Sequence, residues 1–298
     1  MTALRGRLRE AVPMARYTTW RVGGPAECLF EPADAADLGV FLASDKAARP
    51  FFWLGLGSNL LVRDGGLRGS VIRLHRGLSE ITDLGAGRVQ AGAGVACAKL
   101  ARWCGRQGYA EAAFLAGIPG TVGGALAMNA GAWGGETWAQ VETVETVDAR
   151  GHAHRRHRSD YQVGYREVQG PDNEWFTTAI FQFSPGADPT ALQEHVRELL
   201  GERARTQPTG MASGGSVFRN PPGDHAARLI EAAGLKGVQQ GGAWVSDKHA
   251  NFIVHDGDAR AADIENLIEH IQHTVEAAYG VHLQPEVRIV GEEVSHAH

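Results

Sequence analysis

The alternation of apolar and polar positions along the chain predicts short strands interspersed with amphipathic helices. Strands are favoured where β-branched and aromatic residues cluster, at 27–31, 51–54, 70–74, 88–93, 141–148, 175–183, 251–255 and 286–290. Helical spacing is found at 38–47, 96–109, 189–205 and 224–233, and at 264–278, where apolar residues recur every three or four positions. These elements predict an α+β fold.

Three glycine-rich loops interrupt this pattern, at 55–61, 117–131 and 214–221. Glycine makes up 39 of the 298 residues, well above the usual share of about 7%. Because glycine has no Cβ, its loops let backbone N–H groups approach a phosphate or a flat ring closely. The first two loops therefore predict a large phosphate-bearing ligand, and Ser216 in the third presents a hydroxyl for chemistry beside it.

The composition narrows the class of protein. With 43% apolar residues, 21% charged residues and a net charge of −5, the chain is typical of a soluble globular protein and gives no sign of nucleic-acid binding. Residues 1–20 lack an apolar run long enough for a signal peptide, and no run of about 18 apolar residues predicts a membrane span. We therefore expect a cytoplasmic protein.

The cysteines and the histidine-rich segment predict no disulfide and no metal site. Three cysteines without CxxC spacing indicate a reduced protein, and Cys97 and Cys104 should fill the buried face of one helix. His152, His154 and His157 could suggest a metal. They lie beside Arg155, Arg156 and Arg158, which would repel a divalent cation, so a solvated hairpin tip is the better prediction.

Seven segments in order resemble one known family. They are 18–26 (TTWRVGGPA), 55–62, 117–131, Tyr165-Arg166, 215–221, 245–252 (VSDKHANF) and 285–288 (PEVR). Together they resemble the UDP-N-acetylenolpyruvoylglucosamine reductases, also called UDP-N-acetylmuramate dehydrogenases, the flavoenzymes of peptidoglycan precursor synthesis. The resemblance runs from about Thr18 to Glu292, and the short stretch between Ser216 and Trp244 is similar to the shorter of the two types in this family.

The resemblance implies a fold, two cofactors and a substrate. It implies an FAD-binding region of the vanillyl-alcohol-oxidase type plus a C-terminal α+β substrate-binding domain, with subdomains 1–75 and 76–205 for FAD and 206–298 for substrate. It also implies NADPH as hydride donor, a UDP-sugar as substrate, no metal and no obligate protein partner. NADPH and substrate would use the same cleft in turn.

The same resemblance assigns three catalytic residues. Ser216 corresponds to the family's proton donor, although the residues alone favour a turn serine that caps a backbone N–H. Arg166 corresponds to the arginine on the substrate carboxylate, for which a guanidinium fork is suited. Glu286 corresponds to a glutamate near the reacting carbon, where burial would raise its pKa; the alternative is a strand-edge glutamate paired with Arg288.

The first two glycine loops are the predicted FAD site. The residues assigned to the cofactor are Gly55, Leu56, Gly57, Ser58, Asn59, Leu60, Gly117, Pro119, Gly120, Thr121, Gly123, Gly124, Asn129 and Gly131. Each loop is expected to follow a strand. Pro119 is expected in the first turn of a short helix whose N–H groups face the pyrophosphate.

Four further residues are predicted to bind the substrate, namely Tyr165, Arg205, Lys248 and Asn251. The chain departs from the family pattern at Thr206, where many relatives have a lysine associated with phosphate and NADPH. Arg203 or Arg205 could supply the missing charge, and the preference for NADPH over NADH stays open.

Two other functions compete with this prediction. A flavin oxidase on the same scaffold would use oxygen instead of NADPH, and a nucleotide-sugar-binding protein would be colourless. The sequence has neither a dinucleotide-binding fingerprint followed by an acidic residue nor a GxxxxGK[ST] loop, so it predicts no separate NAD domain and no NTPase.

Overall fold

The computed structural model describes residues 3–294, and the chain divides into two compact units that interleave along the sequence. Unit 1 contains the chain up to Glu10, Cys28–Leu56 and Gly69–Gly201. Unit 2 contains Ala11–Glu27, Gly57–Arg68 and the chain from Glu202 on. The sequence-based division after residues 75 and 205 stays a prediction.

A four-stranded sheet holds the N-terminal part of unit 1. Its strands are β1 (Arg7–Pro13), β2 (Pro25–Glu31), β5 (Leu67–Arg73) and β3 (Phe51–Leu54), in this order, and the unit boundaries fall within β1, β2 and β5. Helix α1 (Ala35–Leu42) follows β2. The sequence predicted this helix over 38–47, but it begins and ends earlier. It begins at Ala35 because the Asp34 side chain accepts a hydrogen bond from Asp37 N and caps the helix there.

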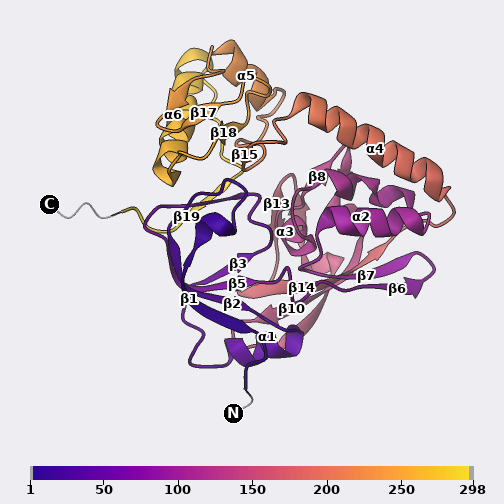
Figure 1. Cartoon of the computed structure of the whole chain (residues 1–298). Helices are drawn as coiled ribbons and strands as arrows, with labels where there is room; N and C mark the ends of the chain where they lie inside the picture. Colours follow the sequence, from indigo (N-terminus) through magenta and orange to yellow (C-terminus); the bar gives the residue numbers. More distant parts are fainter. Residues whose placement is uncertain (1–2, 295–298) are drawn as a thin grey trace. The chain divides into compact units, whose positions relative to one another are not determined.

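An antiparallel five-stranded sheet forms the rest of unit 1. Its order is β11 (Ala153–His157), β10 (Val141–Asp148), β14 (Glu174–Gln182), β7 (Arg88–Gly92) and β6 (Ile81–Gly85). Helices α2 (Cys97–Arg106) and α3 (Val122–Ala127) lie over it (Figure 1) and share its core. Cys97 and Cys104 are buried in that core as predicted, and burial raises the pKa of both thiols to about 12.

Short elements connect this sheet to its surroundings. They are η2 (Ala110–Gly117), β8 (Gly131–Ala132), β9 (Gly135–Glu136), η3 (Thr137–Ala139), η4 (Arg158–Asp160), β12 (Gln162–Gly164) and β13 (Glu167–Gln169). The prediction of a hairpin tip at 152–158 was wrong, because Ala153–His157 forms the edge strand β11 and the turn precedes it.

Helix α4 (Pro189–Thr206) contains the last unit boundary, because unit 1 ends at Gly201 and the rest of the helix is assigned to unit 2. The predicted helix is confirmed, but its apolar face is only partly covered. Val196 packs against the core of unit 1, whereas Leu200 is 41% exposed.

Unit 2 is built around helix α6 (Ala261–Tyr279) and the antiparallel sheet β15 (Ala212–Ser213), β18 (Ile253–His255), β17 (Ala243–Val245) and β16 (Gln239–Gln240). It also contains η1 (Met14–Arg16), α5 (Ala226–Ala232) and the parallel pair β4 (Leu60–Val62) and β19 (Arg288–Val290). The Asp64 carboxylate accepts hydrogen bonds from Ala261 N and Ala262 N at 3.0 Å each, which satisfies the start of α6.

Two glycines at the end of α2 allow a matched test of this architecture. Gly105 is inside the helix, and a Cβ there would meet nothing within 4 Å. Gly105→Ala should therefore raise the free energy of unfolding by about 0.5–1 kcal/mol, since alanine restricts the unfolded chain more than glycine does. Urea unfolding followed by circular dichroism measures this change.

Gly108 is the control for that substitution. It has φ +78°, and its Cβ would lie 2.6 Å from the Ala187 carbonyl oxygen. Gly108→Ala should lower the stability. Equal effects of the two substitutions would contradict the argument.

Candidate active site

The loop that carries Ser216 is held in place by Asn251. Val217 N donates to the Asn251 carbonyl at 2.9 Å, and Phe218 N donates to Asn251 Oδ1 at 2.9 Å. The amide returns a bond from Nδ2 to the Phe218 carbonyl at 2.8 Å. The Asn251 side chain is buried, and both its amide oxygen and its amide nitrogen are hydrogen-bonded to the backbone of Phe218 in the Ser216 loop.

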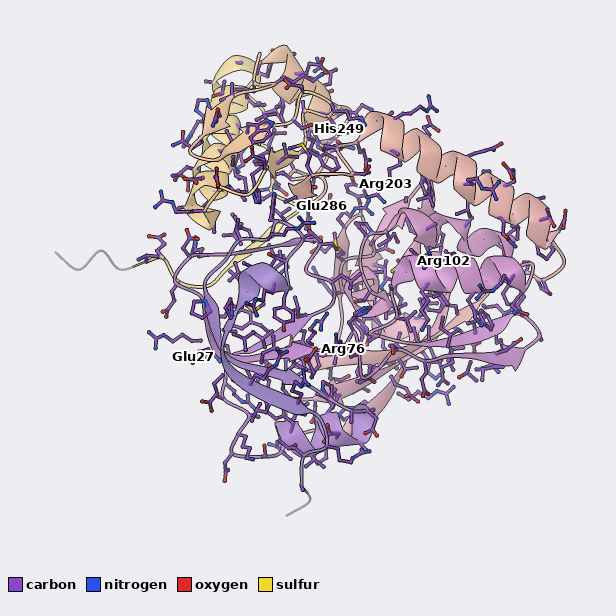
Figure 2. All side chains as sticks on the ribbon, viewed as in Figure 1. Glu27, Arg76, Arg102, Arg203, His249 and Glu286 are labelled. Carbon is purple, nitrogen blue, oxygen red and sulfur yellow. The ribbon has the colours of Figure 1, made fainter. Side chains whose placement is uncertain are left out.

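Glu286 lies on the segment that pairs with the Ser216 loop. Glu286 N donates to the Val217 carbonyl at 2.7 Å, and Phe218 pairs with Pro285 in an antiparallel bridge. The Glu286 carbonyl in turn accepts a bond from Asn59 Nδ2 at 3.0 Å. Within unit 2, these bonds bring the Ser216 loop, Glu286 (Figure 2) and Asn59 of the first glycine loop together.

The Ser216 side chain is half-buried and follows Gly215, whose φ of +78° suits glycine. Among residues 3–294, no protein group forms a hydrogen bond with its hydroxyl. The alternative of a turn serine that caps a backbone N–H is thus not what the structure has. The hydroxyl is available for a ligand.

Trp20 packs against Gly214 in the same loop, and the sequence analysis assigned it no role. It is fully buried, and its ring lies so close to Gly214 that a Cβ there would be 2.5 Å from ring carbon atoms. Its indole N–H donates to the Ile253 carbonyl at 2.9 Å. His255 Nδ1 accepts from Gly257 N, which leaves Nε2 to donate to the Trp20 carbonyl.

In unit 1, Gly55 of the first glycine loop packs against Thr121 of the second. A Cβ at Gly55 would lie 2.4 Å from Thr121 Oγ1, so the two loops come together there only because glycine is present. The prediction that both loops follow strands was half right. Gly55 follows β3, whereas the second loop follows the 3-10 helix η2.

The second loop differs from its predicted geometry. Helix α3 begins at Val122 with Thr121 as its N-cap, so Pro119 precedes the helix and the prediction of a first-turn proline was wrong. The helix N–H groups of Val122 and Gly123 donate to the Val95 and Ala93 carbonyls, at 2.8 Å each, and cannot face a pyrophosphate.

The donors left over are those just before the helix. Within the described chain, the backbone N–H groups of Gly120 and Thr121 donate to no protein group. Thr121 is 3% exposed, and a buried donor of this kind needs a partner. Adjacent open N–H groups in a glycine loop fit the phosphate-bearing cofactor that the loop was predicted to hold.

Arg166 lies at the tip of the two-residue hairpin between β12 and β13, with φ +56°. Its guanidinium donates to the Asn129 carbonyl at 3.2 Å and to the Gly131 carbonyl at 3.1 Å. It also lies 5.2 Å above the ring of Tyr165, which is 51% exposed. A non-glycine residue in the left-handed region is often found at functional sites.

Thr206 is the last residue of α4. Thr206 Oγ1 bonds back to the Glu202 carbonyl at 3.0 Å, and burial lowers the pKa of Arg203 in the same turn (Figure 2). The exposed Lys248 ammonium donates to the Ala204 carbonyl. Lys248 thus brings a positive charge to the end of α4 through its bond to Ala204, which is close in sequence to Thr206.

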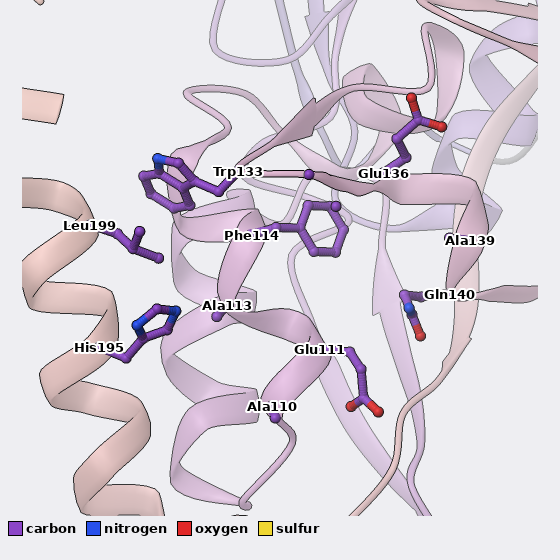
Figure 3. Close-up of a pocket in the computed structure, with 12 residues that line it drawn as sticks. Ala110, Glu111, Ala113, Phe114, Trp133, Glu136, Ala139, Gln140, His195 and Leu199 are labelled. Carbon is purple, nitrogen blue, oxygen red and sulfur yellow. The ribbon is translucent and has the colours of Figure 1, made fainter. Parts of the chain in front are cut away.

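A pocket of about 530 Å³ lies elsewhere in unit 1 (Figure 3). It is lined by parts of η2, by the β8–β9 hairpin, by Ala139 and Gln140, and by two residues of α4. Trp133 of the hairpin lies beside Leu199 of α4. None of the predicted site residues lines this pocket. The described residues contain no group of three or more His, Cys, Asp or Glu side chains that could hold a metal ion, and no helix among them could cross a membrane.

Comparison with known proteins identifies the family. The model of the UDP-N-acetylenolpyruvoylglucosamine reductase C-terminal domain matches residues 207–290, and an FAD binding domain matches residues 26–156. The reductase of Alkalilimnicola ehrlichii is 59% identical over 290 residues, covering 97% of both chains. The chain belongs to the UDP-N-acetylenolpyruvoylglucosamine reductase family. The reductase of Methylococcus capsulatus is 56% identical and covers 97% of this chain and 94% of the relative.

A solved structure agrees with this assignment. The crystal structure of the reductase from Thermus caldophilus has a TM-score of 0.83 and 34% sequence identity, and covers 97% of this chain and 100% of that chain. The resemblance, the fold class and FAD as the cofactor are thereby confirmed, and the chain is a flavoprotein of the oxidoreductase class. The roles of individual site residues stay predictions.

Proposed function

We propose that this member of the reductase family reduces the enolpyruvyl group of UDP-N-acetylenolpyruvoylglucosamine to UDP-N-acetylmuramate with NADPH, in the cytoplasm. In the balanced reaction, a hydride adds to the terminal carbon of the C=C bond. A proton then adds to the carbon next to the carboxylate, and NADPH becomes NADP⁺. Bound FAD supplies the two-electron hydride chemistry that links NADPH to the C=C bond.

The observation that carries the proposal is the Ser216 hydroxyl, which bonds to no protein group in the described chain and lies on a loop that is hydrogen-bonded to Asn251 and to the Glu286 segment. A serine is a poor acid, so it needs a fixed position and a neighbour that stabilises or replaces its proton. Asn251 provides the fixed position through its bonds to Phe218. Glu286 is the neighbour through which we expect the proton to be replaced, and its raised pKa stays a prediction.

The other assigned residues bind and orient. Arg166 would hold the substrate carboxylate, which gains negative charge as the hydride adds. Lys248, rather than the partly buried Arg203, would hold substrate phosphate, because its ammonium is exposed at the end of α4. Gly120 and Thr121 would hold the FAD phosphates through their N–H groups.

The test is an absorbance spectrum of the purified protein, followed under anaerobic conditions by NADPH and then by the enolpyruvyl substrate. We expect a flavin band that bleaches with NADPH and returns with substrate. Bleaching without return would exclude this substrate. Turnover that needs oxygen and no NADPH would favour an oxidase. A protein without a flavin band, even after FAD is added, would contradict the proposal.

A further inference from the structure

Asn129 was predicted to bind FAD, but its side chain is occupied inside the protein. The residue is 1% exposed and has φ +45°. Its Nδ2 donates to Glu136 Oε2 at 3.0 Å and to the Gly164 carbonyl at 3.1 Å. Its Oδ1 accepts from Trp138 N at 3.1 Å. Three bonds fix the orientation of the amide, because Trp138 N can only donate and the Gly164 carbonyl can only accept.

Asn129 contacts both the guanidinium of Arg166 and the backbone of the hairpin that carries Arg166. The Asn129 carbonyl accepts a bond from the guanidinium at 3.2 Å. The Asn129 amide holds the Gly164 carbonyl, at the end of β12, directly before the hairpin tip that carries Arg166. One buried residue, Asn129, is therefore hydrogen-bonded both to the guanidinium of Arg166 and to the strand end from which the Arg166 hairpin tip begins.

The β8–β9 hairpin completes this arrangement. The Gly131 carbonyl accepts the second guanidinium bond at 3.1 Å, and a Cβ on Gly131 would lie 3.4 Å from Arg166 Nη1. The same hairpin supplies Glu136, labelled in Figure 3, as the acceptor for the Asn129 amide. The left-handed backbone of Asn129 is tolerated because asparagine adopts it more readily than most residues.

We propose that Asn129 is the positioning residue of Arg166 and that Glu136 orients its amide. This inference rests on the proposed role of Arg166 at the substrate carboxylate. It replaces the predicted contact between the Asn129 side chain and FAD. Asn129 would thus affect the reaction only by fixing the position of the Arg166 guanidinium.

The decisive substitution is Asn129→Asp, which keeps the size and tolerates the same backbone. A carboxylate there cannot donate to Gly164 and would face the Glu136 carboxylate, so the hairpin tip should shift. We expect the affinity for UDP-N-acetylmuramate, measured by calorimetry on the FAD-loaded protein, to fall about 10–10²-fold, the range for losing a hydrogen bond to a charged group. The affinity for UDP-N-acetylglucosamine, which lacks the carboxylate, should not change.

FAD content separates this inference from the original prediction. If Asn129 positions Arg166, then Asn129→Asp keeps the absorbance ratio of flavin to protein and the rate of bleaching by NADPH. Loss of FAD together with equal weakening of both nucleotide sugars would overturn the inference and support a cofactor contact.

A double-mutant cycle with Arg166→Ala tests the coupling directly. In the Arg166→Ala background, Asn129→Asp should weaken UDP-N-acetylmuramate binding no further. Additive effects of the two changes would overturn the inference. If Arg166→Ala alone leaves the binding of UDP-N-acetylmuramate and its formation unchanged, the proposed role of Arg166 fails instead.

Glu136 gives a second pair of variants should Asn129→Asp fail to fold. Glu136→Gln keeps an oxygen that can accept from the Asn129 amide and should bind UDP-N-acetylmuramate nearly as well as the wild type. Glu136→Ala removes the acceptor and should weaken the binding of this ligand alone. Equal behaviour of the two variants would contradict the orienting role of the carboxylate.

Discussion

Ser216→Ala should leave the reduction of the flavin by NADPH unchanged and slow its reoxidation by the enolpyruvyl substrate by about 10²–10⁴-fold, the usual contribution of a positioned proton donor. The methyl group of alanine keeps the loop but cannot release a proton. No hydrogen bond within the described chain is lost, because the Ser216 hydroxyl makes none there. Stopped-flow absorbance of the two half-reactions measures each rate separately.

Ser213 provides the matched control for this experiment. It precedes the same loop on β15, where it pairs with Val254, and no catalytic role is assigned to it. Ser213→Ala should leave both half-reactions unchanged. If Ser216→Ala reoxidises at the wild-type rate, the proton comes from another group. If both half-reactions slow equally, the substitution has disturbed the fold rather than the proton transfer.

The elements of this fold could be predicted because their patterns are local. Strand β10 and helix α4 have almost the predicted bounds, since alternation and helical spacing are read within one segment. The start of α1 depends on a cap at Asp34 that lies outside the apolar pattern. The interleaving of the two units depends on pairings such as β4 with β19, which no local pattern reveals.

The side-chain contacts of two predicted site residues could not be predicted from the sequence. An asparagine in a glycine-rich loop is equally suited to a ligand and to its own backbone, so Asn129 and Asn251 were assigned to ligands from sequence. In the structure both amides bond to backbone groups beside a catalytic candidate, Arg166 in one case and Ser216 in the other. Only the three-dimensional neighbours decide between these uses.

The contact between Trp20 and His255 could not have been predicted from the sequence either. The two residues are 235 positions apart, and their hydrogen bond lies in the interior of unit 2. The segment around Trp20 contributed to the family resemblance without any role for the indole. Its function in the fold follows from the ring packed on Gly214, two residues before the proposed proton donor.

Trp20→Ala should therefore destabilise the protein by about 3–5 kcal/mol, the range for removing a buried tryptophan. The side chain is fully buried, and its loss also removes the bond to the Ile253 carbonyl. Urea unfolding followed by circular dichroism measures the free energy. Trp20→Phe, which keeps a ring but loses the N–H, should cost less. A loss below about 1 kcal/mol for the alanine variant would contradict the packing argument.

Gly214 allows the same contact to be tested from the other side. A Cβ at Gly214 would lie 2.5 Å from the Trp20 ring, and the residue is not in the left-handed region, so the cost of Gly214→Ala is steric. The substitution should displace the Ser216 loop and slow reoxidation by substrate. In the Trp20→Ala background the added methyl group has room, so Gly214→Ala should cost little further stability. Additive losses would show that Trp20 and Gly214 act independently.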